Sequence, residues 1–139
     1  MTSRGTFEVT LAPLEGYSTG VDGIRLGRMS IDKQFHGGLE AVSKGEMLSA
    51  ISSVKGSAGY VAIEQVTGTL EGRAGSFVLQ HFGTLNRGID RLVLEVVPDS
   101  GTGQLSGLSG SMAIIIDGGR HSYHFEYELP DSKTDRLDV

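Results

Sequence analysis

The sequence lacks cysteine and tryptophan altogether and holds only three prolines in 139 residues. Without cysteine the chain has no disulfide, no thiolate metal site and no cysteine nucleophile. Long apolar runs are missing as well, since no segment approaches the roughly 20 apolar residues that a membrane-spanning helix needs. The stretch Met1–Glu8 contains no apolar core typical of a signal peptide. We therefore expect a cytoplasmic protein that has no membrane partner.

Positive charge is also scarce, because 12 Lys and Arg residues stand against 17 Asp and Glu residues and leave a net charge of −5. Nucleic acids and anionic membrane surfaces are bound by basic faces. The aromatic residues are not interleaved with Lys or Arg in the manner of base-stacking surfaces. We therefore expect no nucleic-acid partner.

Glycine is in excess, at 21 residues of 139. Each glycine inside a helix costs about 1 kcal/mol relative to alanine, so this content disfavours a helical fold. Apolar and polar residues alternate with period two along much of the chain, which predicts β-strands separated by glycine-containing turns. Only residues 39–51 also carry apolar residues at helical spacing. The predicted strands are 5–14, 24–36, 39–52, 60–70, 76–85, 92–97, 111–117 and 121–129, the third of them interrupted near Gly45.

Eight strands with little helix predict an all-β fold, either a barrel or a sandwich. Closure into a barrel removes exposed strand edges, and glycine permits the bends and bulges at the corners of a small barrel. We predict a single eight-stranded antiparallel β-barrel over residues 4–130, followed by a flexible charged tail over residues 131–139. The interior of such a barrel is just large enough for side chains or one small ligand.

The pattern L-x-G-x-x-G-S-apolar occurs twice, at residues 70–77 and 105–112. Each copy is interpreted as the end of one strand, a turn that needs glycine at two positions, and the start of the next strand. A phosphate-binding loop is the alternative. It is disfavoured because no predicted helix and no lysine follow the glycines.

Four stretches, Tyr60–Glu64, Gly68–His81, Ser100–Gly110 and His121–Tyr127, resemble an uncharacterised bacterial family known as domain of unknown function 3224. The likeness extends over about residues 4–130, and its more specific blocks are Gly-Arg-x-Gly-Ser-Phe and Ser-Gly-Thr-Gly. The resemblance implies the allene oxide cyclase-like fold, an eight-stranded antiparallel barrel. It implies no activity, and no motif of the plant cyclases matches this chain, so no catalytic residue is carried over.

Motifs for known chemistries are incomplete in this chain. Residues 99–102, Asp-Ser-Gly-Thr, match one aspartic-peptidase motif, but a single copy beside Pro98 favours a turn. The four histidines show no spacing typical of a metal site, and His121 and His124 fall on opposite faces of one predicted strand. No G-x-S-x-G element supports a serine hydrolase. We predict no metal and no cofactor.

Several polar residues share a predicted strand face with large apolar residues. If these faces point into the barrel, the interior holds a carboxylate, imidazoles and phenols between apolar walls. Which face of the second to fourth strands points inward is not determined by the sequence, because a single bulge would exchange the two faces. The sets are Glu64 with Tyr60 and Val66, His81 with Phe77 and Leu79, His121 with Tyr123, Phe125 and Tyr127, and Lys33 with Met29, Ile31 and Phe35.

Three functions therefore remain open. The first is the binding of a small, largely hydrophobic molecule in the barrel, for which the candidate residues are Tyr60, Glu64, Phe77, His81, His121, Tyr123 and Tyr127. The second is a cyclase or isomerase that uses Glu64 or His81 as its acid–base group. The third is a structural or assembly barrel whose core is filled. A homodimer is also open, with the apolar strand 92–97 as an interface element.

Overall fold

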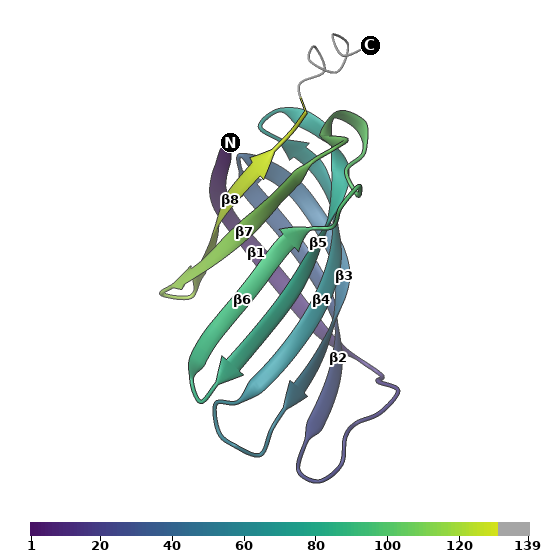
Figure 1. Ribbon diagram of the computed structural model, residues 1–139, viewed down its shortest axis with the longest axis vertical. Coiled ribbons are helices and arrows are strands. Elements are labelled where there is room, and N and C mark those ends of the chain that lie inside the picture. Colours follow the sequence, from purple (N-terminus) through teal and green to yellow (C-terminus); the bar gives the residue numbers. More distant parts are fainter. Residues whose placement is uncertain (131–139) are drawn as a thin grey trace.

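The computed structural model describes residues 1–130 as eight antiparallel strands that close into one barrel, each strand pairing with the next along the chain (Figure 1). This confirms the predicted all-β closed barrel. The tail predicted at residues 131–139 lies outside the described residues. The strands are β1 (Thr2–Leu14), β2 (Arg25–Gly37), β3 (Leu39–Ile51), β4 (Ala58–Leu70), β5 (Arg73–Asn86), β6 (Ile89–Val96), β7 (Ser109–Asp117) and β8 (Arg120–Glu128), and a short 3₁₀ helix, η1 (Gly103–Leu105), precedes β7.

Strand β3 runs without a break through Gly45, so the predicted interruption is wrong, as is the helical alternative for this segment. The glycine instead lets β3 and β4 approach closely. A Cβ atom on Gly45 would lie 2.0 Å from the carbonyl oxygen of Ile63 and 2.6 Å from Cα of Glu64. Glycine inside a strand commonly marks such a close approach of two backbones.

The first glycine of each copy of the repeated pattern lies in a turn, as predicted, but the second, Gly75 or Gly110, lies inside the following strand. The two copies also follow different elements. Gly72 lies in the turn after β4, whereas Gly107 lies in the turn after the helix η1, so the expectation that the second copy ends a strand is wrong. Their φ angles are +84° and +81°, a conformation that glycine adopts without steric cost.

The sequence does not determine which faces of β2 to β4 point into the barrel. Strand register and burial do. Lys33 of β2 lies opposite Ser43 of β3, and Ser43 lies opposite Val66 of β4. All three are buried, so these positions face the interior. The same alternation directs Tyr60 and Glu64 of β4 inward.

One end of the barrel is packed solid. The β2–β3 and β4–β5 hairpins and η1 lie at this end, together with the N-terminus (Figure 1). Its aromatic rings stack, with centroids 5.9 Å apart for Phe77 and Phe125 and 5.3 Å apart for Phe125 and Tyr127. Buried side chains of this end include Phe35, Leu39, Leu70, Phe77, Leu105, Leu108, Phe125 and Tyr127.

The opposite end is open to solvent. Leu11 of β1 and Leu92 of β6 occupy inward-facing positions there, yet 45 % and 36 % of their surfaces are exposed. Met29, Met47 and Tyr60 also face inward at this level and are only half-buried. We call these five residues the mouth of the barrel. Solvent therefore reaches the inner wall from this end.

No helix within residues 1–130 has the length and apolar character needed to cross a bilayer. The cytoplasmic location stays a prediction.

Candidate functional site

Four polar side chains of the interior meet between the packed end and the mouth, where β2, β3, β4 and β5 each supply one group. Glu64 of β4 is completely buried. Its Oε2 accepts a hydrogen bond from Nζ of Lys33 at 2.8 Å and lies 2.5 Å from Nε2 of His81. Its Oε1 accepts a hydrogen bond from Oγ of Ser43 at 2.8 Å. We call Lys33, Ser43, Glu64 and His81 the Glu64 cluster.

Two aromatic rings hold the ammonium group of the cluster. Nζ of Lys33 lies 5.0 Å from the ring centroid of Phe7 and 5.7 Å from that of Phe35. The negative faces of aromatic rings attract cations, most strongly where water is excluded. Lys33 is buried, so these rings and Glu64 replace much of the hydration that the ammonium group loses.

The pKa of Glu64 reflects opposing effects. Burial alone raises it, but the hydrogen bond from His81 and the charge and hydrogen bond of Lys33 outweigh burial and lower the pKa from 4.5 to about 2. Glu64 is therefore a carboxylate at neutral pH, and Lys33 balances its charge.

We expect this lowered pKa to make the fold sensitive to acid. The folded-state pKa of about 2 lies below the ordinary 4.5, so the unfolded chain takes up the proton first as pH falls. The stabilising contribution of Glu64 is complete above pH 4.5 and is lost as pH falls towards 2. Denaturant unfolding at a series of pH values should show the stability gap between wild type and Glu64→Gln narrowing in this window. A gap that stays constant down to pH 3 would contradict the assignment.

Tyr60 stands at the mouth beside the cluster. Its ring centroid lies 6.1 Å from that of His81, and its hydroxyl makes no hydrogen bond to another residue of the described chain. Burial raises the pKa of Tyr60, and the charge of Glu64 raises it further. The phenol thus stays protonated and can donate a hydrogen bond into the mouth.

The other predicted site residues lie elsewhere. Phe77, Tyr123 and Tyr127 are packed into the closed end. The hydroxyl of Tyr123 accepts a hydrogen bond from the Leu39 amide and donates to the carbonyl of His36, both at 2.9 Å, so it fastens the β2–β3 hairpin. His121 faces inward from β8, where its ring centroid lies 5.2 Å from that of Phe7.

The structure therefore brings together Tyr60, Glu64 and His81 of the predicted set. Lys33 is recognisable in the sequence as a charged residue on an apolar strand face, but its pairing with Glu64 is not. Ser43 is missed, although a hydroxyl between Ala41 and Gly45 on an inward face is a recognisable signal.

The four histidines do not converge on a metal site. Within residues 1–130 no group of three His, Asp or Glu side chains is arranged to hold a metal ion. His36 and His124 lie on the outer wall, where Nε2 of each lies close to a glutamate, Glu8 at 2.7 Å and Glu126 at 3.2 Å. In the Glu64 cluster, the carboxylate that a metal ion would need is already paired with the ammonium group of Lys33.

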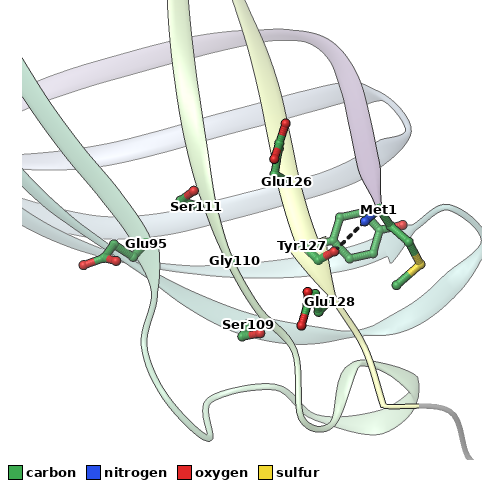
Figure 2. Close-up of a pocket in the computed structure, with 8 residues that line it drawn as sticks. All are labelled: Met1, Glu95, Ser109, Gly110, Ser111, Glu126, Tyr127 and Glu128. Atoms are coloured by element: carbon green, nitrogen blue, oxygen red, sulfur yellow. Dashed lines mark hydrogen bonds between the residues drawn. The ribbon is translucent and has the colours of Figure 1, made fainter.

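A shallow hollow of about 380 Å³ lies on the surface where β6 and β7 diverge (Figure 2). These strands share one register pair, Glu95 opposite Ser111. The N-terminal ammonium donates a hydrogen bond to the carbonyl of Tyr127 at 2.9 Å at its rim. The hollow is rich in exposed carboxylates, and its lining residues are Met1, Glu95, Ser109, Gly110, Ser111, Glu126, Tyr127 and Glu128.

The outer wall carries an apolar row across β3, β4 and β5. Leu48 lies opposite Val61, Val61 lies opposite Phe82, and all three are exposed. They line a second hollow of about 500 Å³ together with Arg28 and Glu46. The predicted homodimer stays a prediction.

These features define a class of protein, an up-and-down β-barrel that is packed at one end and holds a buried charged cluster beneath an open mouth. Residues 3–127 match the family described as "Protein of unknown function (DUF3224)", and the chain belongs to this family, which confirms the predicted resemblance. The chain is similar to a DUF3224 protein of unknown function from Shewanella oneidensis MR-1. That crystal structure is 58 % identical, matches 95 % of this chain and 98 % of its own, and has a TM-score of 0.92. No curated protein matches the chain.

Proposed function

We propose that the barrel binds a small, largely hydrophobic molecule in its open half. The observation that carries this proposal is the apolar mouth, where Leu11 and Leu92 face inward yet remain exposed, directly above the Glu64 cluster. Apolar surface left in water is unfavourable, and apolar concavities with a few polar groups are typical of ligand sites.

The charged cluster supports a binding role over a purely structural one. Replacing a buried ion pair by apolar residues of similar volume is often neutral or stabilising, so Lys33 and Glu64 are poor devices for stability alone. A structural barrel with a filled core accounts for the closed end. It does not account for the exposed inward-facing side chains of the mouth.

The mouth suits an apolar body that carries one polar group. Met29 and Met47 lie directly opposite each other on β2 and β3, and unbranched methionine side chains adapt to ligands of different shape. The polar group of the ligand would meet Tyr60 and His81 at the inner end.

For the alternative function, a cyclase or isomerase, the structure favours a different acid–base residue. Glu64 accepts hydrogen bonds from three side chains and has a pKa of about 2, which makes it a weak base at neutral pH. If the barrel moves protons, His81 is the residue placed to do so, and Glu64 orients it.

A neutral fluorescent probe, 1-aminoanthracene, tests binding in the mouth. We expect Met47→Trp, which fills the mouth from β3, to weaken binding of this probe about tenfold or more, equivalent to about 1.4 kcal/mol. The adjacent Leu48→Trp adds the same side chain to the outer wall and should leave the affinity within about twofold. Fluorescence titration measures both, with circular dichroism as the check of folding.

The outcome separates the two surfaces. Loss of binding in Leu48→Trp alone would place the probe on the outer apolar row. Absence of probe binding to the wild-type protein would contradict the proposed function.

A further inference from the structure

We infer that the ligand of the mouth presents a hydrogen-bond donor, a hydroxyl or N–H group, to Nδ1 of His81. This inference rests on the proposed binding function and specifies the chemical class of the ligand. Its basis is the pattern of donors and acceptors around His81.

Nε2 of His81 faces the carboxylate of Glu64. This nitrogen lies 2.5 Å from Oε2 of Glu64, and an ionised carboxylate can only accept hydrogen bonds. The same Oε2 also accepts from the ammonium group of Lys33. Nε2 of His81 therefore carries a proton and donates it to the shared oxygen.

The cluster pairs one carboxylate with one ammonium group. Glu64 contributes one negative charge and Lys33 one positive charge, so the cluster is neutral when the imidazole of His81 is neutral. A second proton on the imidazole would leave an unbalanced positive charge where only 5 % of His81 is exposed. Ser43 and Tyr60 contribute uncharged hydroxyls. The neutral imidazole then has its lone pair on Nδ1.

No residue of the described chain forms a hydrogen bond with Nδ1 of His81, and no side-chain nitrogen or oxygen in residues 1–130 is both fully buried and unpartnered. Nδ1 therefore keeps contact with solvent. His81 lies opposite Ala62, between Tyr60 and Glu64 along β4, and its ring centroid is 6.1 Å from that of Tyr60, so the mouth is the nearest open side of the barrel interior. The hydroxyl of Tyr60 likewise has no hydrogen-bond partner within the described chain.

Nδ1 of His81 and the phenol of Tyr60 together favour one kind of ligand. Nδ1 of His81 accepts, whereas the phenol of Tyr60 donates, so one neutral hydroxyl on the ligand satisfies both. A carboxylate offers only acceptors and would face the lone pair of His81. We therefore assign the site to apolar alcohols, phenols or enols rather than to carboxylic acid anions.

Three probes that share one ring system test the inference at pH 7.5: 2-naphthol, 2-naphthoate and 2-methylnaphthalene. We expect 2-naphthol to bind about tenfold more tightly than 2-methylnaphthalene, about the worth of one hydrogen bond, and 2-naphthoate to bind most weakly. His81→Phe should abolish the advantage of 2-naphthol. His121→Phe, a matched change of the other inward-facing histidine, should preserve it.

The ligand-free protein provides a test that needs no probe. Long-range ¹H–¹⁵N correlation spectra should show Nε2 of His81 protonated and Nδ1 unprotonated at pH 7.5. A proton on Nδ1, or tightest binding of 2-naphthoate, would overturn the inference while leaving binding in the mouth intact. Failure of all three probes to bind would instead contradict the proposed function.

Discussion

Glu64→Gln is expected to lower the free energy of unfolding by about 3–5 kcal/mol at neutral pH. The substitution removes the countercharge of Lys33, whose ammonium group is buried against Phe7 and Phe35 and has no other carboxylate among its described contacts. It also weakens the acceptor shared by His81 and Ser43. Urea-induced unfolding measures the loss directly, provided that the slope against denaturant is unchanged.

Glu46→Gln is the matched control, because the side chain of Glu46 is exposed on the outer wall and pairs with Arg28 at 2.6 Å. Exposed ion pairs contribute at most about 1 kcal/mol, so this variant should stay close to wild type. Adding Lys33→Met to Glu64→Gln should recover part of the loss, because the buried ammonium group is then gone as well. Equal effects of the two single variants would contradict the buried-pair account.

Gly45→Ala should be similarly damaging, with a loss of about 3 kcal/mol or more at the upper end of the range for overpacking. The added Cβ would collide with backbone atoms of β4, at 2.0 Å from the carbonyl oxygen of Ile63, and with Glu64 itself. Strands β3 and β4 would have to separate where Ser43 and Glu64 meet. Thermal or urea unfolding gives the magnitude, and the pH dependence described for Glu64 should weaken in parallel.

Gly59→Ala is the corresponding control on β4. A Cβ there would meet only the carbonyl oxygen of Gly83, at an ordinary contact distance of 3.6 Å. Replacing glycine by alanine where the backbone allows it often stabilises a protein, by about 0.4–1 kcal/mol. A loss in Gly59→Ala as large as that in Gly45→Ala would show that general loss of glycine, rather than close approach of the strands, is responsible.

Much of the fold was predictable because alternation and glycine-containing turns are local signals. The strand of residues 121–129 alternates without a break, and its inward set, Tyr123, Phe125 and Tyr127, is buried as that alternation implies. The interruption predicted at Gly45 is wrong for a physical reason. A glycine inside a strand marks either a break or a close approach, and only the position of the neighbouring strand distinguishes them.

The candidate site was predictable only in outline. Polar residues that share a strand face with large apolar residues can be recognised strand by strand, which singles out Glu64, His81 and Lys33, but the sequence does not determine that the faces of Lys33 and Glu64 point inward. Their contacts depend on the register between β2, β3, β4 and β5, which alternation alone does not determine. The separation into a packed end and an open mouth depends on the closed barrel as a whole, and this explains why Tyr60 and Tyr127 looked equivalent in the sequence.

The single register pair between β6 and β7 has a consequence for motion. Hydrogen bonds hold β1 to β6 as one continuous ribbon, whereas the β7–β8 hairpin joins that ribbon chiefly through the pairing of β8 with β1. Backbone amides at the sparsely bonded seam have few partners that protect them from exchange with water. The barrel thus consists of a large ribbon and a small hairpin that closes it, and we expect local opening to be easiest between β6 and β7.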